Sequence, residues 1–189
     1  VSNALADQVL AYGGNATLED LRTRVPVETP LQLHGHKLSF GLISRQALGA
    51  REAQLSARQA ALDVVRYEQM GCYSPQVFYV ERGGQVSPRD WCDALAGELS
   101  ALQHRFPRPR PELPDAMGLS SWVQTRAWGD NAHDYTVLGH EQDDWRILFT
   151  EHARDLAPGA LLRSVEVMGV DDLLEVPALI EPRRRWLQS

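Results

Sequence analysis

The chain has 189 residues, 43% of them apolar and 23% charged, with a formal net charge of −6. This length allows one domain with a substantial core but not two full-sized domains. The acidic balance disfavours a nucleic-acid surface, which needs a net basic face, and no apolar run approaches the roughly 20 residues that span a membrane.

Near the start, residues 7–12 predict a short strand that ends at the dipeptide Gly13-Gly14. A helix is expected from about residue 15 to residue 25. Glu19 and Asp20 are expected in its first turn, where acidic side chains favour the helix dipole. The pattern predicts one βα unit.

In the middle of the chain, residues 31–44 predict one strand broken at a glycine, or two short strands. Residues 50–70 predict a long helix with a stripe of small residues, and residues 76–81 predict a buried strand. The next helix is expected to begin with Ser87 as N-cap. Its expected apolar face is Trp91, Leu95, Leu99, Leu102 and Phe106.

After a proline-rich connection, a short helix is expected near residues 114–128, followed by a hairpin at 133–151. Residues 161–170 predict another strand, and residues 170–182 are ambiguous. Strands alternate with helices through the first half. This order predicts an α/β fold built as a layered sheet, with a hairpin added near the C-terminus.

The sequence contains two cysteines, Cys72 and Cys92. They are too few for a disulfide framework, and no secretory signal is recognisable, so a cytoplasmic location is expected. Their spacing is unlike that of zinc ligands, so no metal site is expected. Cys92 follows a tryptophan on a packed helix and is interpreted as structural.

Cys72 lies in the segment RYEQMGCYSPQVFYVERGG, residues 66–84, where a helical pattern gives way to a strand. Most free cysteines are small buried side chains, which favours a structural role. Gly71 permits a sharp turn, and the turn lies at a strand end, where α/β folds place ligands. The preceding helix end disfavours a thiolate, so the residues alone leave both roles open.

The segment DVVRYEQMGCYSPQVFYVE, together with GHKLSFGLI upstream, resembles the bacterial long-chain acyl-CoA reductases. These are the fatty-acid reductases of bioluminescent bacteria, within the aldehyde dehydrogenase superfamily. Their loop of the form Gln-Gly-Cys-x-Ser-Pro is matched by Gln69, Gly71, Cys72, Ser74 and Pro75. The resemblance implies a three-layer αβα catalytic domain with a mixed, mostly parallel sheet.

The resemblance implies that Cys72 takes the acyl group from a fatty acyl-CoA as a thioester. Hydride from NADPH, or NADH, would then release the aldehyde. Gln69, Gly71 and Ser74 would support the loop, with Gln69 either donating to an oxyanion or capping helix carbonyls. Gly13 and Gly14 would lie near the nicotinamide end of the cofactor.

Two departures from the family pattern matter. The segment LQLHGHKL lacks the glutamate that activates water in aldehyde dehydrogenases, which suits a reductase. His34 and His36 in this segment could orient a substrate carbonyl or phosphate, or be a solvent-facing pair. The Gly-rich first half of the cofactor domain is missing, so residues 1–28 would be its last βα unit and residues 29–189 the catalytic domain.

Two other functions stay open. The chain could be a non-redox acyl carrier or acyltransferase that uses Cys72, or a non-catalytic module in which Cys72 only packs. Expected partners are the acyl thioester, the missing cofactor domain, and either a second copy of the chain or a separate acyl-transfer enzyme.

Overall fold

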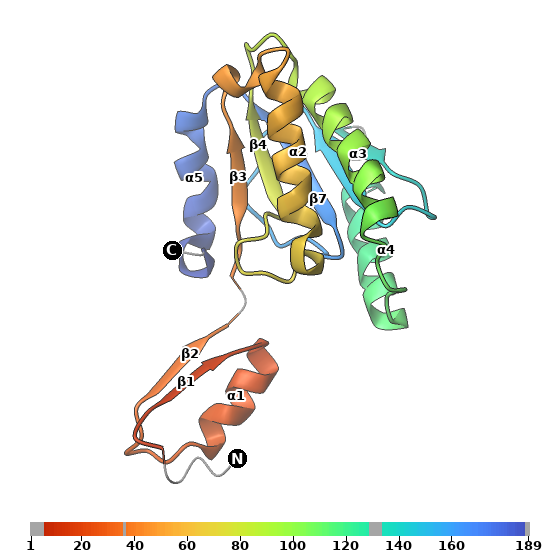
Figure 1. Ribbon diagram of the computed structural model, residues 1–189. Helices are drawn as coiled ribbons and strands as arrows, with labels where there is room; N and C mark the ends of the chain where they lie inside the picture. Colours follow the sequence, from red (N-terminus) through yellow and green to blue (C-terminus); the bar gives the residue numbers. More distant parts are fainter. Residues whose placement is uncertain (1–5, 36, 129–133, 188–189) are drawn as a thin grey trace. The chain divides into compact units, whose positions relative to one another are not determined.

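The computed structural model describes residues 6–35, 37–128 and 134–187. The chain divides into two compact units, Val1–Lys37 and Leu38–Ser189 (Figure 1). The first unit therefore extends past residue 28, where the sequence predicted its end. The reason is that the strand at 31–34 pairs with the strand before it.

The first unit is a βαβ unit. Its elements are β1 (Val9–Tyr12), α1 (Asn15–Arg24) and β2 (Leu31–His34). The two strands are parallel, with Val9 opposite Leu31. The predicted strand and helix are confirmed, but α1 has no acidic residue in its first turn, because it begins at residue 15 and Glu19 lies beyond that turn.

The second unit is built on a five-stranded sheet with the order β3-β4-β7-β6-β5. The first four are mutually parallel and β5 is antiparallel to β6, which confirms the mostly parallel sheet and the hairpin. The strands are β3 (Phe40–Ile43), β4 (Val77–Glu81), β5 (Tyr135–Leu138), β6 (Arg146–Thr150) and β7 (Ser164–Val170).

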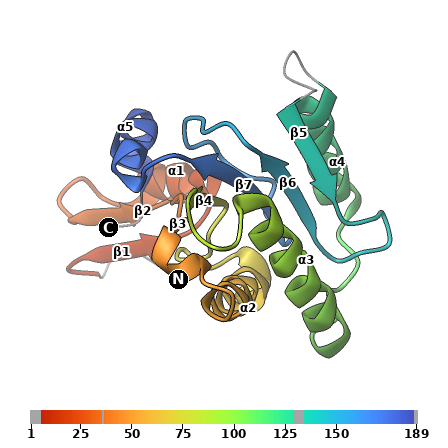
Figure 2. The same cartoon turned by 90° about the horizontal axis from the view of Figure 1, so that it is seen from above.

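Helices cover both faces of this sheet (Figure 2). α2 (Glu52–Val65) and α3 (Pro88–Arg105) lie side by side on one face. α4 (Leu113–Trp128) packs against β5 and β6, and α5 (Val176–Ile180) lies across the sheet from α2. The result is the three-layer αβα arrangement.

The ambiguous stretch after β7 is helical. A 3₁₀ turn (Leu173–Glu175), α5 and a second 3₁₀ segment (Glu181–Trp186) follow one another. The side chain of Asp172 accepts a hydrogen bond from the Leu174 N–H and caps the first of them.

The start of α3 follows from its sequence. The Ser87 hydroxyl accepts a hydrogen bond from the Asp90 N–H, and proline occupies the first turn, where its missing donor costs nothing. The predicted apolar face is buried from Trp91 through Leu102. Phe106 was wrongly included, because the helix ends at Arg105 and the Phe106 side chain is 43% exposed.

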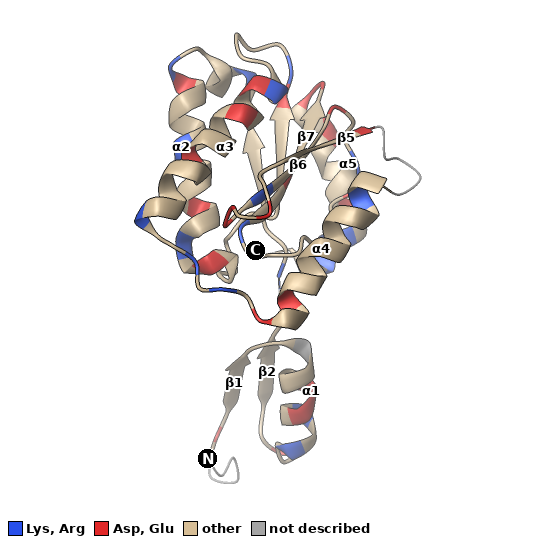
Figure 3. Ribbon diagram, turned by 90° about the vertical axis from the view of Figure 1, so that its right-hand side faces the viewer, with Lys and Arg blue, Asp and Glu red and all other residues tan. Residues whose placement is uncertain are grey.

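Two apolar clusters lie on opposite faces of the sheet, because side chains alternate along each strand. The first contains Val165 and Val167 and packs against α2 and α3, while the second contains Met168 and Val170 and packs against α5. Charged residues are spread over the helices and connections, and the strands between them are mostly uncharged (Figure 3). No helix within the described residues is long and apolar enough to cross a membrane.

Candidate active site

Cys72 is exposed and lies in a tight turn in the segment that leads into β4. The Ser74 N–H donates to the Gly71 carbonyl at 2.9 Å and closes this turn. The turn is thus at the amino end of β4, whereas parallel sheets commonly bind ligands at the carboxyl ends. The sequence argument from the strand end was therefore wrong, although the position of Cys72 in a turn is confirmed.

Gln69 is 1% exposed and holds this turn to its surroundings. Its Nε2 donates to the carbonyl oxygens of Pro75 and Ser164, each at 2.8 Å, and its Oε1 accepts from the Ser164 N–H at 3.0 Å. Both amide protons are engaged, so Gln69 has none left for an oxyanion. Neither acceptor belongs to a helix, so these contacts match neither of the two roles expected for the Gln69 amide, donation to an oxyanion or capping of helix carbonyls.

Ser39 reaches the turn from the other side. Its hydroxyl donates to the Cys72 carbonyl at 2.6 Å, and its own carbonyl accepts from the Gln76 N–H at 2.9 Å. The sequence reasoning missed Ser39. The available signal was its position directly before the strand β3. Because Phe40 pairs with Val77 in the parallel register, the residues that precede β3 and β4 lie close together.

Gly71 and Ser74 shape the turn. Ser74 is 7% exposed, and a Cβ at Gly71 would lie 3.2 Å from the Ser74 hydroxyl oxygen. The neighbouring side chains of Tyr67, Met70 and Tyr73 are all largely exposed. The cysteine and these three neighbours in the sequence are therefore all open to solvent.

In the first unit, Gly13 and Gly14 connect β1 to α1. Gly14 is the N-cap, and the helix start has neither a side-chain cap nor an acidic residue in its first turn. Such a start suits an anionic group, because the first amide N–H groups point out of the helix. His34, at the end of β2, stacks on Tyr12 with ring centroids 4.7 Å apart. His36 lies outside the described residues.

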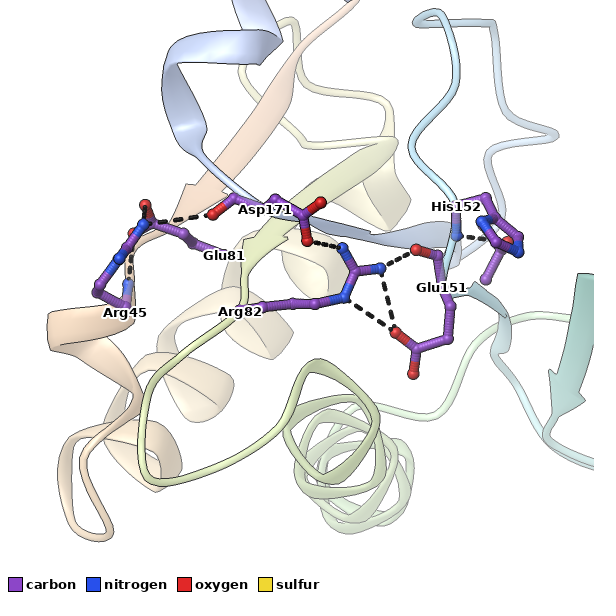
Figure 4. A network of polar contacts seen from close by, with 7 residues as sticks. Arg45, Glu81, Arg82, Glu151, His152 and Asp171 are labelled. Carbon is purple, nitrogen blue, oxygen red and sulfur yellow. Dashed lines mark hydrogen bonds and ion pairs between the residues drawn. The ribbon is translucent and has the colours of Figure 1, made fainter.

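The carboxyl edge of the sheet carries a network of ion pairs (Figure 4). Arg45 bonds to Glu81, while Arg82 bridges Glu151 and Asp171. The hydrogen bonds from Arg45 lower the pKa of Glu81 to about 2. These charged groups pair with one another at the carboxyl edge of the sheet, where a parallel sheet would be expected to bind a ligand.

A buried carboxylate, Glu166, lies in the middle of β7 and is 1% exposed. It accepts a hydrogen bond from the Tyr135 hydroxyl and lies 3.8 Å from Arg126. Burial raises the pKa of Glu166 above its usual value. These contacts join α4 and the edge strand β5 to the central strand β7. Within the described residues, no group of three or more His, Cys, Asp or Glu could hold a metal ion.

The fold is that of aldehyde dehydrogenases. The chain is similar to the NADP-dependent glyceraldehyde-3-phosphate dehydrogenase of Bacillus halodurans (TM-score 0.64, 14% identity), covering 94% of this chain and 38% of that one. It is also similar to a benzaldehyde dehydrogenase of Corynebacterium glutamicum (TM-score 0.63, 12% identity), covering 93% of this chain and 39% of that one. The chain thus spans less than two fifths of these structures.

The particular family is shown by the sequence. Residues 2–189 match the family model of the acyl-CoA reductases of the LuxC type, so the chain belongs to that family. The resemblance noted from the cysteine segment is confirmed at the level of the family. No curated protein sequence matches the chain.

Proposed function

We propose that this chain is the catalytic part of an enzyme that reduces a fatty acyl-CoA to an aldehyde, with Cys72 as the acylated nucleophile. The observation that carries the proposal is the exposed Cys72 thiol in a turn whose backbone is fixed by Gln69 and Ser39. It lies in a chain that belongs to an acyl-CoA reductase family. The exposure argues against a cysteine that only fills a gap in the core.

The chemistry needs two steps at Cys72. Its thiolate attacks the thioester carbonyl, a new carbon–sulfur bond forms, and coenzyme A leaves with its sulfur protonated. A bound NADPH, or NADH, would supply the hydride that reduces the acyl carbon, and the Cys72 sulfur would leave as a thiolate when the aldehyde is released. The apolar side chains of Tyr67, Met70 and Tyr73 would contact the acyl chain.

The residues of the first unit fit part of a nicotinamide cofactor. The uncapped start of α1 after Gly13 and Gly14 would hold an anionic group, and no acidic side chain opposes it there. One similar structure is named as NADP-dependent and another as NAD-dependent, which supports this class of cofactor. β2 ends in His34 and carries no glutamate, the residue type that activates water for thioester hydrolysis in aldehyde dehydrogenases.

Mass spectrometry of the full-length native protein after incubation with a fatty acyl-CoA tests the proposal. We expect a hydroxylamine-sensitive acyl adduct on Cys72 that disappears in Cys72→Ala. The matched control is Cys92→Ser, which removes the buried cysteine and should keep the adduct. Equal labelling of Cys72→Ala and the parent would contradict the proposal.

Oxidation of the cofactor distinguishes the reductase from a non-redox acyltransferase. With NADPH and acyl-CoA present, a reductase consumes one NADPH for each aldehyde released. Transfer of the acyl group to an acceptor without loss of NADPH absorbance would support the acyltransferase instead.

A further inference from the structure

Two short stretches of left-handed backbone precede β4 and β7, which are neighbouring strands; the second leads directly into β7, while the first is separated from β4 by the segment that contains Cys72. Tyr67–Gln69 have φ angles of 53°, 53° and 61°, and Leu161–Arg163 have φ angles of 59°, 56° and 60°. None of these residues is glycine, and the conformation is unfavourable for them because Cβ crowds the next carbonyl. It persists only where surrounding contacts hold it. These segments are called the paired turns.

The paired turns are held by contacts with each other. The Arg163 guanidinium donates to the Glu68 carboxylate at 2.5 Å and to the Phe106 carbonyl, at the end of α3, at 2.7 Å. The Arg163 side chain is only 1% exposed. Beside this ion pair, Gln69 and Ser164 form two hydrogen bonds in opposite directions. Each turn thus stabilises the other, and α3 anchors both.

The contacts of the first turn continue into the cysteine segment. Gln69 also donates to the Pro75 carbonyl, so the two ends of the segment that contains Cys72 are joined directly. On the far side, the Ser39 hydroxyl holds the Cys72 carbonyl. The backbone of Cys72 is therefore fixed from β3 and from the paired turns, while its thiol stays open to solvent.

We propose that Glu68 and Arg163 are positioning residues that hold the paired turns, and through them Cys72, in the geometry needed for acylation. The inference rests on the proposed acyl-cysteine chemistry. Neither residue needs to touch the substrate. A nucleophile displaced by about 1 Å can lose on the order of a hundredfold in rate, so loss of the ion pair should slow acylation.

The test compares Glu68→Ala with Glu81→Gln in the full-length protein. Glu81 is also paired with an arginine, but it lies at the opposite end of β4. Single-turnover acylation of Cys72 by a fatty acyl-CoA should slow roughly tenfold to a hundredfold in Glu68→Ala. Glu81→Gln should leave that rate unchanged. Glu68→Gln keeps an oxygen that can accept from Arg163 and should recover part of the loss.

Two further measurements would distinguish a positioning role of the Glu68–Arg163 ion pair from an effect of the substitution on overall stability alone. Amide hydrogen exchange of residues 70–74 should be faster in Glu68→Ala and not in Glu81→Gln. Alkylation of Cys72 by iodoacetamide at pH 7 should keep the rate of the parent, because this small reagent needs no fixed geometry at the exposed thiol.

Normal acylation in Glu68→Ala, or unchanged exchange at 70–74, would overturn the positioning role. If the parent itself is not acylated, the proposed function fails instead. In that case, amide exchange of residues 70–74 and alkylation of Cys72 still test whether the paired turns hold the segment that contains Cys72.

Discussion

Arg45 and Glu81 join the start of the segment after β3 to the carboxyl end of β4. The Arg45 backbone N–H donates to one oxygen of the Glu81 carboxylate at 2.8 Å, and its guanidinium donates to the other at 2.5 Å. This pairing lowers the pKa of Glu81 to about 2. Cys72 lies in the segment before the amino end of β4. Substitutions at Glu81 and substitutions near Cys72 therefore test the two ends of this strand separately.

The first prediction concerns acid stability. Because the pKa of Glu81 falls from 4.5 to about 2 on folding, its ionised form stabilises the fold above pH 4.5. That contribution is lost as the pH falls from 4.5 toward 2. Glu81→Gln should be less stable than the parent at pH 7, with a difference that narrows below pH 4.5. Urea unfolding at pH 7, 4 and 3 measures it, and a difference independent of pH would contradict the prediction.

The second prediction concerns the two cysteines. Cys72 is exposed, while Cys92 is fully buried and burial raises the pKa of its thiol to about 12. Because the thiolate is the reactive form, iodoacetamide should alkylate Cys72 at least about a hundredfold faster than Cys92. Cys72→Ser should take up no label until urea unfolds it. Rapid labelling of that variant in the native state would show that Cys92 is accessible.

Much of the fold could be predicted from local signals. Ser87 and Pro88 define the start of α3, and the continuous apolar run at β4 matches a strand buried on both faces. α2 was expected to run to residue 70 but ends at Val65. The left-handed turn that follows contains no glycine, so the sequence offered no conventional sign of it.

The contacts that fix the candidate site could not be predicted in the same way. Gln69 and Ser164 are 95 residues apart in the sequence and meet because β4 and β7 are adjacent. Strand order is set by the packing of the whole sheet, so it cannot be predicted from a local sequence pattern. Glu166 was missed for the same reason, since its partner Tyr135 comes from an edge strand.

The third prediction uses two glycines. A Cβ at Gly41 would clash with the ring of Phe78, its neighbour across β3 and β4, which is 3% exposed. Gly41→Ala should therefore destabilise the fold by about 1–3 kcal/mol. Gly97, in α3, has nothing within 4 Å of an added Cβ. Gly97→Ala should instead stabilise the fold by up to about 1 kcal/mol. Thermal unfolding of both variants measures this, and equal shifts would contradict it.

The last prediction concerns Glu166, whose pH dependence should oppose that of Glu81. Burial raises the pKa of Glu166 despite the hydrogen bond from Tyr135 and the nearby Arg126. The folded state therefore holds its proton to higher pH than the unfolded chain, so Glu166 makes the fold less stable as the pH rises above 4.5. Glu166→Gln keeps an oxygen for Tyr135 and removes the ionisation.

Relative to the parent, Glu166→Gln should become more stable between pH 4.5 and pH 8, whereas the difference between Glu81→Gln and the parent should stay constant there, because the Glu81 contribution changes only below pH 4.5. Urea unfolding of both variants across this range provides the comparison. If Glu166→Gln instead loses stability relative to the parent as the pH rises, attraction between the Glu166 carboxylate and Arg126 outweighs the cost of burial. In that case the prediction is wrong, because the ionised pair would then stabilise the attachment of α4 to the sheet.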